Sequence, residues 1–398
     1  MDSIWINSPA GVMAVLCAVA AGWFYIAQVT GWKLFQYVPP LLFIYATPVL
    51  LNNTGIIPAT SPVYAGLSDF VLPAFIVLML IKVNLPAAVR IMGKGVLVML
   101  MGTTGVVVGA VISYAIVHRW LAPDAWTGFG ALAGSWIGGT GNMAAVSQML
   151  NTSPEQFGLA VIADNVIYLV WLPILLASRN FADRFNKWAR VPEDRIRMME
   201  AASDAVIEQE RVAEMRDYIY LACIAIGVTW LSKVLAASLF EQMMSRTPSL
   251  EVLLSESTWR ILLITTIALT LSATPVRRLP AATHLGTAMI YIFVAGMGAR
   301  ASVEGFAQAP AFLLGAFIWI FIHGAFCVAG AKIFRVDVHS VAIASAANIG
   351  AAASAPIVAA FHRPSLVPVS ILMALIGYAL GNYLAPIAAH LARIVAGQ

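Results

Sequence analysis

The sequence predicts an all-α, polytopic membrane protein with about 11–13 transmembrane helices. Of the 398 residues, 61% are hydrophobic and only 11% are charged, whereas soluble domains carry roughly a quarter charged residues. Apolar runs of about twenty residues, the length that crosses a bilayer, recur along the chain. Two of these runs contain a polar interruption rich in small residues near their middle, which favours a binding site inside the membrane.

Charge, cysteines and motifs exclude several other classes of protein. The net charge of +4 is explained by basic residues in cytoplasmic loops, so no nucleic-acid partner is expected. Cys17, Cys223 and Cys327 are isolated in apolar runs, which predicts neither a disulfide framework nor a metal centre. No HExxH, GxSxG or P-loop sequence is present, so we expect no enzyme and no cofactor.

Two sets of membrane spans are predicted on either side of a charged linker. The first apolar run is long enough to span and follows no basic region, so it is interpreted as a retained helix. The spans fall near 11–30, 34–51, 67–83, 95–117, 128–150 and 157–178, and near 218–240, 259–274, 285–300, 310–331, 339–360 and 366–394. The domain boundaries that follow are a first transmembrane repeat (1–178), a cytoplasmic linker (179–217), helical after Pro192, and a second transmembrane repeat (218–398).

The two sets resemble copies of one unit. The segment 46–49 (ATPV) recurs as 273–276. Tyr168 follows Ser135 of the first polar interruption at the same spacing at which Tyr378 follows Ser345 of the second. Such internal repeats are common in secondary transporters.

The charges disagree with six crossings in each half. A cytoplasmic linker puts Arg277, Arg278 and Lys332 inside, as the positive-inside rule expects, but six crossings leave Lys82 and Lys94 outside. An inverted repeat needs an odd number of crossings. Either the count is wrong by one or the repeat is parallel, and we prefer an inverted repeat with a miscount.

Each interruption predicts a broken helix. Three glycines within four residues, at 138, 139 and 141, disfavour a continuous helix and free backbone groups to hold a ligand. Close helix packing is the alternative, and it explains the alanines after the second interruption well but an asparagine in each interruption poorly. The predicted solute site comprises Ser135, Gly138, Gly139, Thr140, Gly141, Asn142, Ser345, Asn348, Gly350 and Ser354.

Asp164 and Asn165 lie in the middle of the span after the first interruption. A carboxylate near the bilayer centre costs roughly 2.5–3.5 kcal/mol on insertion scales, so it usually faces a cavity and has a function. We predict that Asp164, Asn165, Asn142 and Asn348 bind the coupling ion, with either sodium at Asp164 or a proton as its occupant. A structural partner for Asp164, such as Arg300 or His323, is the alternative.

The segments 134–142 (GSWIGGTGN) and 347–351 (ANIGA), with the spacing of the spans, resemble the YjcL-like family of integral membrane proteins. The resemblance implies the superfamily of cation:proton antiporters, bile acid:sodium symporters and sodium:glutamate symporters. It further implies a scaffold domain and a mobile core domain with two broken, crossing helices, and transport by an elevator-type movement. The antiporters' acidic or Asn-Asp pair is matched in placement by Asp164-Asn165 in reversed order. Their basic partner has no counterpart, since 374–376 (ALI) occupies its region.

These observations predict a secondary active transporter in the cell inner membrane. It would couple sodium or protons to the movement of a small polar or anionic organic solute, such as an amino acid, short peptide or organic acid. A cation:proton antiporter is the alternative. The expected partners are a small-molecule solute and the lipid bilayer, with a homodimer as a further option.

Overall fold

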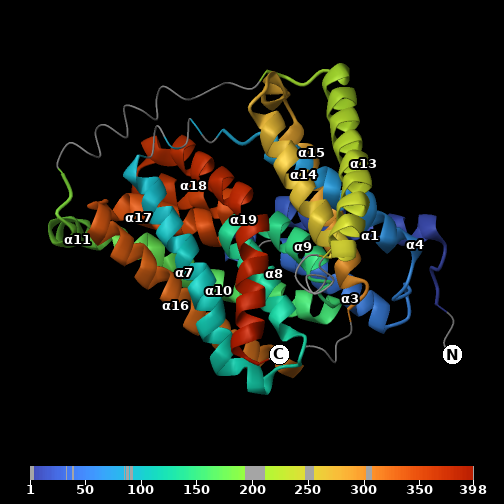
Figure 1. Ribbon diagram of the computed structural model, residues 1–398, viewed down its shortest axis with the longest axis horizontal. Helices are drawn as coiled ribbons and strands as arrows, with labels where there is room; N and C mark the ends of the chain where they lie inside the picture. Colours follow the sequence, from blue (N-terminus) through green and yellow to red (C-terminus); the bar gives the residue numbers. More distant parts are fainter. Residues whose placement is uncertain are drawn as a thin grey trace.

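The computed structural model describes residues 4–32, 34–37, 40–84, 86, 89, 93–192, 211–246, 255–301 and 307–397. Within these ranges the regular structure is entirely helical and no strand occurs (Figure 1). Seven helical segments there are long and apolar enough to cross a membrane. They are Pro9–Thr30 (α1), Pro62–Leu80 (α4, Pro62–Gly66; η1, Leu67–Val71; α5, Leu72–Leu80), Lys94–Trp120 (α7, Lys94–Val117; η2, His118–Trp120), Pro154–Ala189 (α10, Pro154–Ala177; η3, Ser178–Phe181; α11), Met215–Ser245 (in α13, Met215–Arg246), Ala309–Phe334 (α16) and Pro364–Val395 (η7, Pro364–Leu366; α19, Val367–Val395).

Shorter helices complete the fold. They are α2 (Leu34–Tyr37), α3 (Pro40–Asn53), α8 (Ala125–Gly138), α9 (Thr140–Met149), α14 (Glu256–Ser272), α15 (Ala282–Gly298), α17 (Val338–Ile349) and α18 (Ala351–His362). In the linker, α11 (Ala182–Ala189) is helical, whereas the helix predicted after Pro192 falls largely outside the described residues. Serine residues cap the N-termini of α1, α10 and α14. Ser8, Ser153 and Ser255 each accept a hydrogen bond from a backbone amide of the first helical turn.

The predicted span near 128–150 is a helical hairpin, here called hairpin 1 (residues 125–149). Gly139, with φ 80° and ψ −178°, separates α8 from α9. The two arms are antiparallel, because Thr152 Oγ1 donates to the Thr127 carbonyl at 3.4 Å and a Cβ on Gly134 would lie 2.7 Å from the Asn142 carbonyl oxygen. Arms of 14 and 10 residues reach about 21 and 15 Å, short of a bilayer core of about 30 Å.

The predicted span near 339–360 is a second helical hairpin, hairpin 2 (residues 338–362). The imidazoles of His339 and His362, at the far ends of α17 and α18, are 3.0 Å apart between their Nδ1 atoms. Near the turn, Ser354 Oγ donates to the Ala346 carbonyl at 3.1 Å.

The predicted helix breaks are therefore confirmed, but the segments near 128–150 and 339–360 are hairpins and not the single spans that were predicted. Each chain segment turns back at its glycine and leaves on the side from which it came. Hydropathy records how long an apolar run is and not whether it reverses direction, so the run of residues 128–150 resembles one span.

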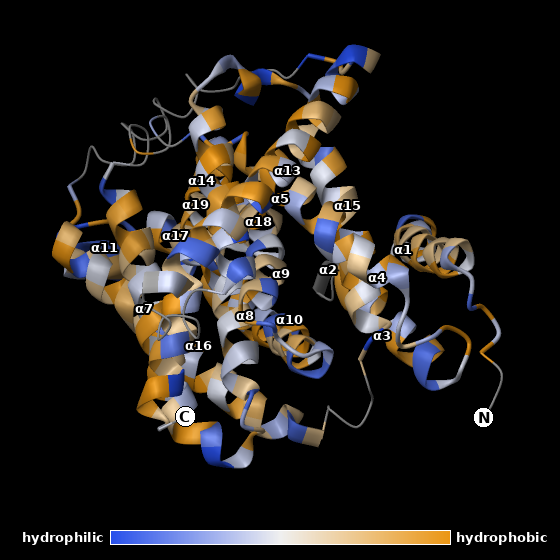
Figure 2. Ribbon diagram, turned by 45° about the vertical axis from the view of Figure 1, so that its right-hand side comes forward, coloured by the Kyte–Doolittle hydropathy of each residue, from blue (hydrophilic) through white to orange (hydrophobic). Residues whose placement is uncertain are grey.

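The helices form two groups, which Figure 1 shows next to each other, and Figure 2 shows hydrophobic residues along the helices of both groups. The hairpin bundle contains α7 to α10 and α16 to α19, in which α7 packs along α16 and α8 along α19. The flanking bundle contains α1, α3 to α5 and α13 to α15. Each bundle takes elements from both sides of the linker. The division into two sequence repeats remains a prediction.

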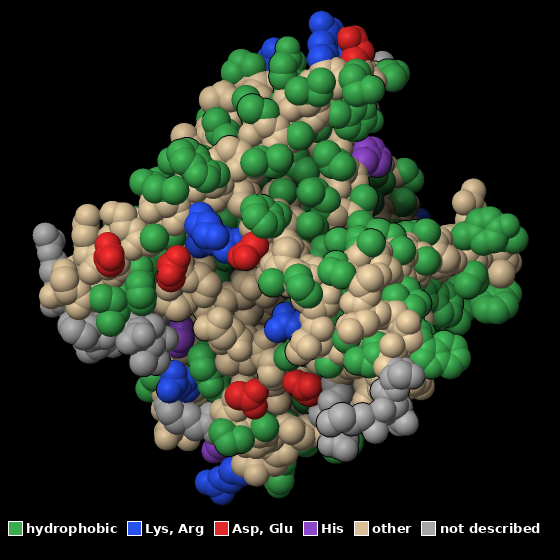
Figure 3. All heavy atoms as spheres, turned by 90° about the vertical axis from the view of Figure 1, so that its right-hand side faces the viewer, with side chains coloured by type: hydrophobic (Ala, Val, Ile, Leu, Met, Phe, Trp, Pro, Cys, Tyr) green, Lys and Arg blue, Asp and Glu red, His purple; other side chains and the backbone are tan. Residues whose placement is uncertain are grey.

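The outer surface suits a lipid environment. Figure 3 shows hydrophobic side chains over much of one face, with charged side chains across its middle and toward its top and bottom edges. On α13, which lies at this side of the molecule, Ile226 and Trp230 are 64% and 66% exposed. Exposed apolar side chains on a long apolar helix are expected where the solvent is lipid.

Candidate functional site

The turns of the two hairpins meet inside the hairpin bundle. A Cβ on Gly139 would lie 2.8 Å from the Ala351 Cβ and 3.3 Å from the Tyr378 ring. A Cβ on Gly138 would lie 2.6 Å from the Gly377 carbonyl oxygen of α19. The turn of hairpin 1 is thus pressed against both hairpin 2 and α19, with no room for side chains at its glycines.

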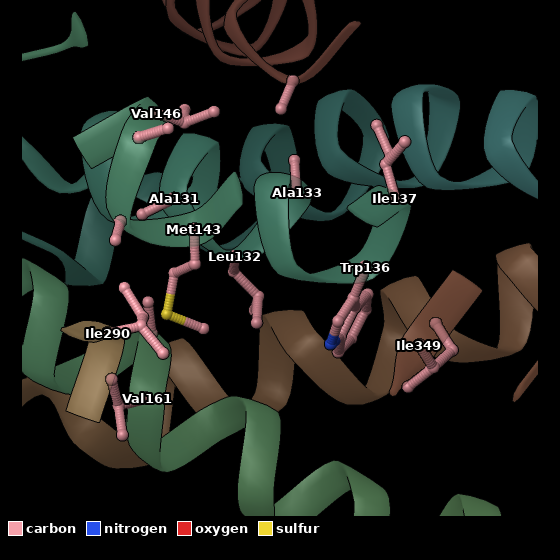
Figure 4. Packing of buried hydrophobic residues seen from close by; sticks show 14 of the residues in the cluster. Ala131, Leu132, Ala133, Trp136, Ile137, Met143, Val146, Val161, Ile290 and Ile349 are labelled. Carbon is pink, nitrogen blue, oxygen red and sulfur yellow. The ribbon is translucent and has the colours of Figure 1, made fainter. Parts of the chain in front are cut away.

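The arms behind this contact are tightly packed. Figure 4 shows Leu132 and Trp136 of α8 and Met143 of α9 pointing into one packed space. The Trp136 ring stacks at a tilt on Trp319 of α16, with ring centroids 4.7 Å apart. The Trp319 indole nitrogen in turn donates to the Val106 carbonyl of α7 at 2.7 Å. Hairpin 1 is therefore held in place by large aromatic side chains.

Asp164 of α10 lies beside hairpin 1. Its two carboxylate oxygens accept hydrogen bonds at 3.0 Å, one from Ser135 Oγ and one from Trp136 Nε1. Neither predicted structural partner bonds Asp164, because Arg300 lines a cavity that does not include Asp164 and His323 bonds Gly102 and Ser345. Among the described residues no cationic side chain forms an ion pair with Asp164. Two neutral donors thus hold a carboxylate that remains partly exposed.

Asn142 of α9 bonds hairpin 1 to α19, which in turn bonds the flanking bundle. Its amide nitrogen donates to the Tyr378 carbonyl at 3.1 Å and to Asn382 Oδ1 at 2.8 Å, both in α19. The Asn382 amide donates to Thr265 Oγ1 of α14 at 2.8 Å. A cavity of about 10 Å³, just the volume that one water needs, lies between these asparagines and Phe75 of α5.

Asn348 of α17 has a structural environment. It is fully buried. With the amide oriented to satisfy both ends, its nitrogen donates to the Ala344 and Met99 carbonyls at 3.2 Å each, and its oxygen accepts from Thr103 Oγ1 at 2.9 Å. These partners come from α7 and α17, so Asn348 fastens hairpin 2 to α7.

Ser345 also belongs to a closed network. Its hydroxyl accepts from the Trp171 indole at 2.9 Å and lies 2.9 Å from His323 Nε2. His323 Nδ1 lies 2.9 Å from the Gly102 carbonyl. Because a carbonyl can only accept, Nδ1 carries the proton and Nε2 accepts from the Ser345 hydroxyl. Every polar atom of this set has a partner, which leaves Ser345 little capacity for a solute.

The other predicted site residues differ in availability. Asn165 is buried and donates to the Val161 carbonyl of its own helix at 2.7 Å. Thr140 is partly exposed at the turn of hairpin 1, and Gly141 packs against the Phe75 ring. A Cβ on Gly350 would lie 3.3 Å from the Tyr168 ring.

The structure thus brings Ser135, Asp164 and the turn of hairpin 1 together, and it separates Asn348 and Ser345 into networks around α7 and α16. The polar side-chain atoms of Ser135 and Asp164 are oxygens, the type of ligand that suits a proton or a small hard cation. Among the described residues no cluster of three His, Cys, Asp or Glu side chains forms a transition-metal site. Sequence reasoning missed Asn382 and Thr265, although an asparagine in the middle of the last apolar run was a visible signal.

Comparison with known proteins agrees with a membrane protein. The model of a family described as "Protein of unknown function (DUF819)" matches residues 14–394. The chain is also similar to the "Uncharacterized membrane protein YjcL" of Bacillus subtilis (strain 168), with 24% identity over 387 residues that cover 96% of this chain and 95% of that protein. These matches span nearly the whole length of both chains.

Proposed function

The chain belongs to the DUF819 family, and on that premise we propose that it is a secondary active transporter. It carries a small polar or anionic organic solute across the cell inner membrane, coupled to sodium or protons. The observation that supports this proposal is Asp164, a carboxylate within an apolar helix, bonded to Ser135 and Trp136 and lacking a cationic partner among the described residues. Such groups cost free energy in a membrane and are generally retained for ion or proton binding.

The proposed mechanism assigns different roles to the two bundles. The hairpin bundle acts as the mobile core and the flanking bundle as the scaffold, in an elevator-type movement. Two features support this assignment. The turns of both hairpins lie in one bundle, and described polar bonds between the bundles include those from Asn382 to Thr265 and from Tyr45 to the Pro154 carbonyl. The superfamily of antiporters and sodium symporters fits this arrangement.

Ion binding at Asp164 is the step that couples the two fluxes. A proton or sodium ion neutralises the carboxylate and lowers the cost of moving it through the membrane. Ion binding at Asp164 affects hairpin 1 through the hydrogen bonds from Ser135 and Trp136, since both donors lie in the last turn of α8 next to Gly139.

The test begins with a thermal-shift screen of the purified protein against amino acids, short peptides and organic acids, in sodium and in potassium. A stabilising solute is then followed into proteoliposomes with an imposed sodium or pH gradient. We expect Asp164→Asn to abolish gradient-driven uptake while the protein remains folded. The matched control is Asp124→Asn, an exposed carboxylate that bonds Ser153 before hairpin 1, which should keep uptake.

Gradient-driven uptake at the wild-type rate by well-folded Asp164→Asn protein would refute the assignment. A cation:proton antiporter would behave differently, because cations alone would dissipate a pH gradient in everted vesicles without any organic solute.

A further inference from the structure

A second polar cavity lies away from the hairpin turns. It has a volume of about 470 Å³ and opens between the bundles, within the range of about 300–1,000 Å³ that is usual for small-molecule sites. On one side lies the loop and helix segment of residues 59–69 and on the other the end of α9, residues 147–152. Gln148 is eight residues from Thr140, about 12 Å along the helix, so this cavity is separate from the turn of hairpin 1.

Among the described residues that line the cavity, Arg300 is basic and Asp69 is acidic. Arg300 follows α15 and is exposed, and its guanidinium donates to Met297 Sδ at 4.0 Å. The Asp69 side chain is 46% exposed and accepts through Oδ1 from Arg260 at 3.0 Å. Arg260 also bonds the Ser68 and Asp69 carbonyls, which fixes this acidic wall in place.

The other lining side chains are mostly polar, and only some of them are already hydrogen-bonded within the protein. Tyr64, Ser147 and Thr152 donate their hydroxyl protons to backbone carbonyls. Thr60 and Gln148, both lining the cavity, have no hydrogen bond to other described side chains. The cavity therefore contains hydroxyl groups that are already hydrogen-bonded to the backbone and fix its shape. It also contains polar side chains that can form hydrogen bonds with a solute.

We propose that this cavity binds a small zwitterion of the size of an amino acid or short peptide. Arg300 receives the carboxylate through the two-pronged contact that a guanidinium offers. The free oxygen of Asp69 receives the ammonium group, and the carbonyl end of α9 adds a favourable partial charge. The assignment rests on the proposed transport function only in making this cavity the place where the solute first binds.

The test measures binding to the purified full-length chain by isothermal titration. The probes are glycine, γ-aminobutyrate, diglycine and triglycine, which place the two charges progressively further apart. N-acetyl-diglycine and diglycinamide each lack one charge, and succinate carries two negative charges. We expect a zwitterion of matching length to bind, and blocking either charge to weaken its binding at least about ten-fold, the usual effect of losing a charged hydrogen bond.

Three variants complete the test. Arg300→Gln should weaken binding of the zwitterion at least about ten-fold, whereas Arg119→Gln, an exposed arginine outside the cavity, should leave it unchanged. Binding should persist in Asp164→Asn, which separates this proposal from the coupling role of Asp164. The proposal is overturned if none of the four zwitterions binds, if succinate binds better than all of them, or if Arg300→Gln binds as wild type.

Discussion

At Gly139 the backbone has φ 80° and ψ −178°, a region of conformational space that is essentially restricted to glycine. The position where a Cβ would stand is also taken, because the Ala351 Cβ lies 2.8 Å away. One residue thus sets both the reversal of hairpin 1 and its contact with hairpin 2.

We expect Gly139→Ala to destabilise the protein and to reduce uptake strongly. The backbone strain alone is worth about 1–3 kcal/mol, and the clash with Ala351 adds to it. Thermal unfolding in detergent and uptake in proteoliposomes measure the two effects. Gly227→Ala is the control, since it lies in α13 with open space around it. A Gly139→Ala protein as stable and active as that control would contradict the role of the turn.

Single residues also show how far the sequence could lead. Asn142 and Asn348 are equivalent in the sequence pattern, yet Asn142 bonds across to α19 beside a small cavity and Asn348 is enclosed by α7 and α17. A motif identifies the amide but not its partners, which come from helices hundreds of residues away. Asp164 was identifiable because a lone carboxylate in an apolar run is costly wherever it points.

At the level of elements, hydropathy predicted the helices well and the direction of two of them badly. The observed α7 (Lys94–Val117) and α10 (Pro154–Ala177) lie within a few residues of their predicted spans. The hairpins were mistaken for spans because both arms are apolar and buried against protein. Tertiary contacts, absent from a hydropathy profile, satisfy their turns.

The hairpins also reconcile the charges with the predicted membrane orientation. If all the other predicted spans cross the membrane and those at 128–150 and 339–360 do not, each half has five crossings, an odd number. The basic residues Lys82, Lys94, Arg277 and Lys332 are then expected on the side of the linker. The contact of Lys82 Nζ with the Leu279 carbonyl at 3.2 Å places these two helix ends together. Hairpin 1 then opens to the outside and hairpin 2 to the cytoplasm.

This orientation predicts opposite labelling of the two hairpin bases. In a background with Cys17 and Cys223 replaced by serine, a membrane-impermeant maleimide should label Pro123→Cys in intact cells. It should label Pro364→Cys only after permeabilisation. Both prolines are exposed and directly adjoin a hairpin. Labelling of both sites from the same side would contradict the arrangement.

For the whole molecule, the boundary between the bundles is the feature on which the proposed movement depends. It is crossed by the bond from Asn382 to Thr265 and by that between Thr266 and Tyr383, each 2.8 Å long. Short polar contacts of this kind can be exchanged for others at modest cost, because each contributes only about 0.5–1.5 kcal/mol net.

Covalent closure of this boundary should therefore stop transport. We expect a short bifunctional thiol reagent joining Thr265→Cys to Asn382→Cys to abolish uptake, with recovery on cleavage of the linker, while solute binding is retained. The control joins Trp23→Cys to Thr47→Cys, a pair bonded at 2.8 Å within the flanking bundle, and should leave uptake intact. Full uptake after complete cross-linking of the first pair would exclude relative movement of the bundles.

The packing of α7 on α16 has a consequence for how the chain matures. A Cβ on Gly105 would lie 2.7 Å from the Phe326 Cβ, so the two helices are in very close contact. Asn142 of hairpin 1 likewise bonds Asn382, a residue near the C-terminus. During synthesis, hairpin 1 leaves the ribosome long before α16, hairpin 2 and α19 exist. The turn of hairpin 1 therefore lacks its contacts with hairpin 2 and α19 until translation is nearly complete. The final packing of this turn is one of the last events in biogenesis.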